Sequence, residues 1–237
     1  MLAMGAGGGF QSSDIMGFRI GAGDLGAMGA SQSQLTREEL RDYTELTYLS
    51  KKEIIYAFKR FKAISPDQVN SDKEIRLPVR DVEILPEFSS NPFRDRLLRT
   101  FSSLKDDRLS FEDFLDLLSV LSEAAPIDVK MEYAFQVFDF NDDGELCKED
   151  LAELIHRLTW LHDKKLEHQE VQLLIENVLR EADLDQNGRL SLLEFQHCMR
   201  KNPDFERHVP ELDAAKTWAL SRLSSTLAYS SNRTLLS

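Results

Sequence analysis

Two glycines at the same place in two short acidic loops are the strongest constraint on how this chain folds. Of its eleven glycines, nine lie between Gly5 and Gly29, and the other two are Gly144 and Gly188. Each of these two follows a cluster of Asp and Asn residues and precedes a leucine by two positions. A residue type kept for two equivalent positions meets a backbone requirement, most simply a positive φ angle in a sharp turn.

The second of these loops carries an oxygen donor at every position that a calcium loop uses. A calcium-sized cation takes about six to eight oxygen ligands, and a loop of about 12 residues supplies them from fixed positions. In residues 183–194 the side chain of Glu194 is long enough to give both oxygens, whereas Arg189 gives only its backbone carbonyl. We therefore predict a full calcium site with the ligands Asp183, Asp185, Asn187, Arg189 and Glu194, and with Ser191 at position 9.

The first loop, residues 139–150, has a similar set with one departure. Its last ligand is Asp150, one methylene shorter than glutamate, so we expect it to reach a metal with one oxygen. A six-coordinate, octahedral site of that kind is what Mg²⁺ prefers. Cys147 is a poor ligand for a hard cation, and we expect water in its place. The prediction is Mg²⁺ at rest and weaker Ca²⁺ binding, through Asp139, Asn141, Asp143, Glu145 and Asp150.

Helical periodicity surrounds both loops, and the whole unit repeats along the chain. Residues 102–113 form a weaker copy with Leu104 at position 3 and Asp107 where glycine would stand, and the unit around residues 58–61 has no ligand set. We predict an all-α protein with four EF-hand helix–loop–helix units in two lobes. The N-terminal pair is degenerate and the C-terminal pair binds metal. Residues 67–86, punctuated by prolines, are predicted to be an irregular connection.

Composition divides the chain into four segments. Residues 1–34 are predicted to be a disordered tail rich in Gly, Ala and Ser, because they cannot assemble an apolar face. Residues 35–123 form the N-terminal lobe and residues 124–205 the C-terminal lobe. Residues 206–237 are an extension in which apolar residues recur at helical spacing, which is consistent either with an amphipathic helix or with a loosely ordered tail. The apolar positions are Leu212, Ala215, Ala219, Leu223 and Leu227.

Charge and motif content argue against several classes of protein. The net charge of −12 does not suit a nucleic-acid binder, which must neutralise phosphates. The two cysteines form no metal-binding pair, and we expect a reducing, cytoplasmic location. No apolar stretch is long enough to span a membrane. The five histidines are scattered and no catalytic motif is present, so we do not expect an enzyme.

Longer stretches resemble the calcium- and integrin-binding proteins. The matching segments are LTYLSKKEI at 46–54, NPFRDR at 91–96, LSFEDFLDLLSV at 109–120, YAF at 133–135, FDF at 138–140 and NPDF at 202–205. The resemblance implies two inactive N-terminal hands, two active C-terminal hands, and Asp at position 12 of the third. It also implies a regulatory adaptor that binds an amphipathic helix of a partner, such as an integrin α cytoplasmic tail, a kinase or a channel subunit. The groove positions that match are Phe114, Leu118, Ile155, Ile175 and Phe195.

Both ends of the chain depart from that family. Its members begin Met-Gly and are myristoylated, whereas here Met28-Gly29 is internal. We expect a shorter product in which Gly29 carries the lipid and reaches the inner face of the plasma membrane. The C-terminal extension is longer than in the family, and as an amphipathic helix it would compete for the groove.

Two other functions remain open from the sequence alone. One is a regulatory subunit of an enzyme, similar to calcineurin B, although the inactive N-terminal loops argue against it. The other is a plain calcium buffer, whose helices barely separate when the ion binds. The partner, the ion affinities and the oligomeric state do not follow from the sequence.

Overall fold

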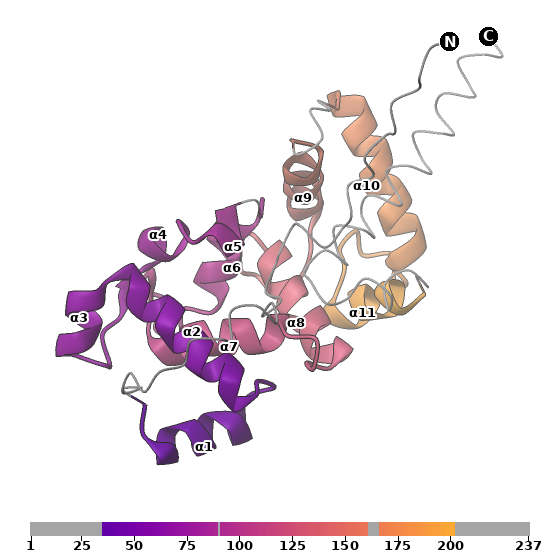
Figure 1. Ribbon diagram of the computed structural model, residues 1–237. Helices are drawn as coiled ribbons and strands as arrows, with labels where there is room; N and C mark the ends of the chain where they lie inside the picture. The colour runs from indigo at the N-terminus through magenta and orange to yellow at the C-terminus, as the bar shows by residue number, and fades with distance from the viewer. Residues whose placement is uncertain (1–34, 90, 161–165, 202–237) are drawn as a thin grey trace, which may run out of the picture.

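The protein is known here from a computed structural model, which describes residues 35–89, 91–160 and 166–201. The first half of this part contains α1 to α7 (Figure 1) and both strands. These elements are α1 (Arg37–Leu46), α2 (Lys51–Ile64), α3 (Pro66–Ser71), β1 (Leu77–Pro78), α4 (Val79–Val82), α5 (Pro86–Ser89), α6 (Arg94–Thr100), β2 (Arg108–Leu109) and α7 (Phe111–Leu121). The second half contains α8 (Ile127–Phe138), α9 (Lys148–Trp160), α10 (His168–Ala182) and α11 (Leu192–Arg200). The all-α prediction is confirmed.

Several helices begin with a reciprocal cap that can be read from the sequence. At α1 the Thr36 hydroxyl accepts a hydrogen bond from the Glu39 amide, and the Glu39 carboxylate accepts one from the Thr36 amide. Equivalent boxes begin α2 at Ser50, α7 at Ser110 and α11 at Ser191. Each cap satisfies amides at a helix start that have no partner inside the helix. These caps fix where a loop ends and its exiting helix begins.

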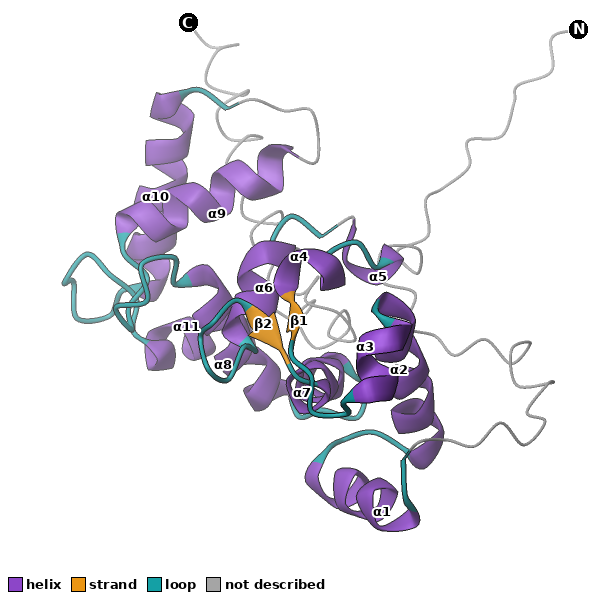
Figure 2. Ribbon diagram, turned by 90° about the vertical axis from the view of Figure 1, so that its left-hand side faces the viewer, coloured by secondary structure: helices purple, strands orange, loops and turns teal. Residues whose placement is uncertain are grey.

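Short antiparallel pairs join the loops two by two. In the N-terminal half β1 pairs with β2, with Leu77 opposite Leu109 (Figure 2). In the C-terminal half Leu146 and Leu190 form a single bridge, with N–O distances of 2.9 and 3.0 Å. All four leucines are buried. The two halves therefore repeat one arrangement, in which a leucine from each loop packs between the helices.

The connection between residues 67 and 86 is more regular than predicted. It contains most of α3, together with β1 and α4. Pro66 occupies the first turn of α3, where its missing amide hydrogen costs nothing, and Leu77 pairs with a strand far along the chain. Val69 and Val82 are fully buried, so tertiary packing holds segments that the polar and proline-rich sequence obscured.

One hydrophobic cluster runs through both halves. It includes an aromatic group in which Phe111 of α7 lies edge-on to Phe58 and Tyr43, at ring centroid distances of 5.0 and 5.6 Å. Helix α8 contacts α6 and α7 as well as α9 and α11. The predicted lobe boundary, between residues 123 and 124, falls between α7 and α8, and the division into two lobes stays a prediction.

A cluster of two arginines and one phenylalanine connects the N-terminal half to the first acidic loop. Phe140 stands at position 2 of that loop. The guanidinium of Arg157 lies 4.8 Å from the centroid of its ring, and the guanidinium of Arg96 lies 5.7 Å from it. Arg157, from α9, also pairs with Asp95 of α6 at 2.6 Å. Cations over an aromatic face are attracted by its quadrupole. The loop therefore rests against α6.

Arg96 is the buried member of this cluster. Its guanidinium donates to the carbonyls of Gln136, Val137 and Asp139, where α8 ends, and forms an ion pair with Asp142 at 2.8 Å. The carbonyls at a helix C-terminus carry partial negative charge, so a cation there is stabilising. Arg96 thus caps the C-terminus of α8 and also holds the start of the first acidic loop.

The predicted terminal segments, residues 1–34 and 206–237, lie outside the described residues, as does Gly29. Among the helices in the described ranges, none has both the length and the apolar character needed to cross a bilayer.

We predict that Arg96→Met destabilises the protein by about 3 kcal/mol, because it leaves buried carbonyls and a carboxylate without their donor. Urea unfolding of the metal-free protein measures this change. The matched control is Arg99→Met, one turn along the same helix, whose side chain is 59% exposed and pairs with exposed Asp107. An equal effect of the two substitutions would contradict the role given to Arg96.

Candidate metal centre

The carboxylates of the second acidic loop converge on one point. Ligand oxygens of Asp183, Asp185 and Glu194 all lie within 4.8 Å of one another. Glu194 is buried, Asp183 is half-buried and Asp185 is exposed. Hard divalent cations are held by clusters of oxygen ligands of this kind. The donor set therefore fits the calcium site predicted for positions 1, 3 and 12.

Backbone amides hold the first and last of these carboxylates in place. Asp183 caps the end of α10 and accepts from the amides of Asn187 and Gly188 at 3.1 and 2.8 Å. Glu194, in the first turn of α11, accepts from the amides of Leu184 and Ser191 at 2.8 and 2.9 Å. Gly188 has φ +82°, the left-handed conformation inferred from its position. These hydrogen bonds hold the first and last residues of the loop against its interior backbone.

The first acidic loop has the same scaffold. Asp139 accepts from the amides of Asp143 and Gly144 at 3.1 and 2.8 Å, and Gly144 has φ +85°. Asp150 accepts from the amides of Phe140 and Cys147, both at 2.9 Å, as Glu194 does from the equivalent residues. The shorter side chain at position 12 therefore still joins the two ends of this loop.

The two loops differ in how their acidic oxygens are gathered. In the part of the chain that the structure describes, only the second loop brings three carboxylates within 4.8 Å. The first loop has carboxylates at positions 1, 5 and 12 and an amide, Asn141, at position 3. Asp143 Oδ2 accepts from Asn141 at 2.9 Å, as Asp185 Oδ2 accepts from Asn187 at 3.1 Å in the second loop, but Asp143 Oδ2 also pairs with Arg189 at 3.2 Å. The shorter Asp150 and this outward pairing leave the first loop less converged.

Arg189 has a role beyond the backbone carbonyl predicted for it. Its guanidinium crosses to the first loop and pairs with Asp143 and Glu145 at 3.2 and 3.1 Å. The side chain is 47% exposed, so these pairs lie at the rim of the loops. Arg189 thus ties the two loops together through charge as well as through the neighbouring leucine bridge.

Burial and hydrogen bonds act in opposite directions on the pKa values of acidic groups in these loops. Burial raises the pKa of Glu194, but hydrogen bonds from Ser191, Leu184 and Asp185 outweigh burial and lower the pKa overall. Burial raises the pKa of Asp139, and the nearby Asp150 and Asp143 carboxylates add to that rise. Burial is also the main cause that raises the pKa of the Cys147 thiol to about 11. At neutral pH this thiol stays protonated, which supports the expectation that it is a poor ligand.

The five predicted groove residues all lie in the hydrophobic core. Their exposed fractions are 5% or less, and they belong to the same cluster: Phe114, Leu118, Ile155, Ile175 and Phe195. Phe195 packs edge-on against Phe135 at a centroid distance of 5.7 Å. A partner helix would reach these side chains only after neighbouring helices separate, so the groove stays a prediction.

Sequence reasoning missed three arginines that organise the loops, namely Arg76, Arg96 and Arg157. One signal for Arg76 was available. An Arg-Leu pair stands at the centre of three loops, at 76–77, 108–109 and 189–190, and in each the leucine forms the inter-loop pair. Arg96 and Arg157 carry no such local signal. The partners of Arg96 lie 40 or more residues away, and Arg157, apart from its pair with Glu153 on the same helix, reaches Asp95 across 62 residues.

We predict that Glu194→Gln weakens Ca²⁺ binding at the second loop on the order of 100-fold, because it removes a negative ligand oxygen. The first loop should keep its affinity, since Asp139 and Asp150 are untouched. Calcium titration by calorimetry separates the two sites, and Glu176→Gln on α10, outside the loop, serves as the charge-matched control. Loss of the weaker site instead of the stronger would contradict this assignment.

Comparison with known proteins agrees with this arrangement of loops. The family model "EF-hand domain pair" matches residues 128–200. "Calcium and integrin-binding family member 2" of Drosophila melanogaster is 40% identical over 184 residues, which cover 75% of this chain and 96% of that protein. The human proteins named members 2 and 3 of the same family are 38% and 39% identical over 182 residues, with the same coverage. This chain belongs to the calcium and integrin-binding protein family.

Proposed function

We propose that the protein is a calcium-responsive regulatory adaptor that binds an amphipathic helix of a partner protein. The observation that carries the proposal is the convergence of Asp183, Asp185 and Glu194 in a loop bridged to a second acidic loop. Paired loops of this kind change the angle between their helices when a sensor binds calcium, and this exposes an apolar groove. The names of the relatives add an integrin as a partner of that family.

We further propose different ions for the two loops. The second loop has the ligand set for Ca²⁺. The first loop is proposed to hold Mg²⁺ at resting calcium, since Asp150 favours six-coordination and its carboxylates converge less closely. In that state half of the site is already ordered, and the second loop acts as the sensor.

Asp150→Glu tests the proposed magnesium preference. The longer side chain supplies a second oxygen, so Ca²⁺ affinity of the first loop should rise about tenfold while Mg²⁺ affinity falls. Competition titrations of the two ions measure this, and Glu149→Asp, the adjacent exposed residue, is the control for a one-methylene change. A gain confined to the second loop, or no gain, would contradict the proposal.

The partner site is proposed to lie over Phe114, Leu118, Ile155, Ile175 and Phe195. An amphipathic helix in this groove would use anchors about one turn apart, at positions i, i+3 or i+4, and i+7. Candidate partners are an integrin α cytoplasmic tail, a kinase or a channel subunit. Because the five side chains are buried in the described structure, the proposal requires an opening of the helices that the ion favours.

Fluorescence of an apolar dye separates a sensor from a buffer. We expect Ca²⁺ to increase dye binding relative to chelator, because opening exposes core side chains, and Glu194→Gln to abolish the increase. A helical integrin-tail peptide should compete with the dye. Dye fluorescence that is equal with and without Ca²⁺ would indicate a buffer and contradict the adaptor function.

Two further proposals concern segments beyond the described residues. A product that begins at Met28 would carry a myristoyl group on Gly29 and bind the inner plasma membrane reversibly, since one acyl chain anchors weakly. The extension 206–237 would compete for the groove as an amphipathic helix. Mass spectrometry of the native N-terminus tests the first. Unchanged peptide affinity after truncation at Pro210 would contradict the second.

A further inference from the structure

The loop of residues 102–113 keeps the backbone shape of a metal loop, although Leu104 leaves it without an oxygen ligand at position 3. Lys105 and Asp107, at positions 4 and 6, have φ +51° and +55°. In the second acidic loop, positions 4 and 6 are Gln186 and Gly188, with φ +60° and +82°. A left-handed conformation is costly for a residue with a side chain, so something in the surroundings must hold the loop in this shape.

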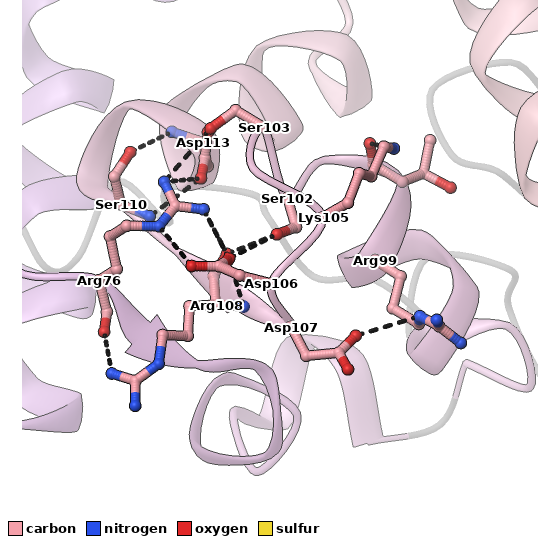
Figure 3. Close-up of polar contacts among 11 residues, drawn as sticks. Arg76, Arg99, Ser102, Ser103, Lys105, Asp106, Asp107, Arg108, Ser110 and Asp113 are labelled. Carbon is pink, nitrogen blue, oxygen red and sulfur yellow. Dashed lines mark hydrogen bonds and ion pairs between the residues drawn. The ribbon is translucent and has the colours of Figure 1, made fainter.

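A guanidinium group lies where the ligand oxygens of this loop converge (Figure 3). Arg76 Nη2 lies 2.9 Å from Asp106 Oδ1 and 2.9 Å from the carbonyl oxygen of Arg108, and Nη1 lies 3.0 Å from Asp113 Oδ2. These three residues stand at positions 5, 7 and 12, each of which supplies a metal ligand in an active loop. The same three oxygens that would face an ion therefore face Arg76.

The register of the paired loops explains how Arg76 reaches this place. Leu77 lies opposite Leu109, so Arg76 occupies position 7 of the first unit. Arg189 occupies position 7 of the fourth unit and also reaches the position 5 carboxylate of its partner loop, Asp143. Arg189 stays at the rim with 47% of its side chain exposed, whereas Arg76 is 18% exposed and reaches the position 12 carboxylate.

The charge and the planar shape of the Arg76 guanidinium suit a site between two carboxylates. The hydrogen bond from Arg76, above all other causes, lowers the pKa of Asp106 to about 2. Asp113 is buried, and its carboxylate also accepts a hydrogen bond from the Ser110 amide at 3.1 Å, in the cap of α7. A planar guanidinium can bond several oxygens at once and stays charged at every pH at which the protein folds. A fixed cation in this place joins β1, the loop and α7.

We propose that Arg76 is a built-in substitute for a metal ion in the loop of residues 102–113. It holds residues 102–113 closed at every calcium concentration and prevents a divalent cation from entering. The N-terminal half is then ordered independently of the ion, and calcium acts through the C-terminal loops alone. This inference concerns the fold of the N-terminal half and does not depend on the identity of the partner.

Hydrogen exchange of the full chain, in Ca²⁺ and in chelator, tests the proposal. In the wild type we expect residues 102–110 to exchange equally in both conditions, while residues 183–194 exchange faster in chelator. Arg76→Met should speed exchange of residues 102–110 by roughly tenfold or more, because local opening no longer breaks an ion pair. In Arg76→Lys the exchange rate of residues 102–110 should lie between those of the wild type and Arg76→Met, since lysine keeps the charge but lacks the planar guanidinium that bonds several oxygens at once.

Arg80→Met is the matched control, since Arg80 is 84% exposed and pairs with its neighbour Asp81. It should leave the exchange of residues 102–110 unchanged. If Arg76→Met does not fold, Arg76→Lys provides the same comparison with the control. Protection of residues 102–110 that falls in chelator as it does for residues 183–194, or an Arg76→Met protein that exchanges like the control, would overturn the proposal.

Discussion

Oxygen atoms that converge inside a short loop repel one another, and a positive charge between them relieves the repulsion. The rest of this structure depends on how each loop meets that constraint. Asp183, Asp185 and Glu194 form the arrangement that a divalent cation neutralises. In residues 102–113 the cation is the side chain of Arg76. On the proposed function, one fold therefore contains a loop that responds to an ion and a loop that has its charge supplied permanently.

Rigid connections place these loops in one assembly. Leucine pairs join the loops in each half, and the core is continuous between the halves. Arg96 closes the end of α8 and holds the first acidic loop against α6, while Arg157 pairs with Asp95 across the same contact. An N-terminal half that is ordered without metal would act as the support on which the C-terminal helices move. In that view the inactive hands position the active ones.

The local features of the site could be predicted from the sequence, because ligand spacing, helix caps and the glycine turn each act within about twelve residues. Gly144 and Gly188 have the positive φ angles inferred from their places, and the fold class and family are those predicted. The arginine contacts were missed, because Arg76 meets Asp106 30 residues away and Arg96 meets Asp142 after 46, and only Arg76 carries a local signal, the repeated Arg-Leu pair. The short elements between residues 66 and 82 were missed for the same reason, since their order comes from buried side chains in a polar, proline-rich stretch.

On the proposed function, calcium binds the C-terminal pair of loops and does not bind the loop of residues 102–113. Native mass spectrometry of the full chain at saturating Ca²⁺ counts the bound ions directly. Two ions are expected, one for each C-terminal loop, with no further ion added as the calcium concentration rises. A third specific ion would contradict the closure of residues 102–113 by Arg76, and fewer than two would contradict the metal centre.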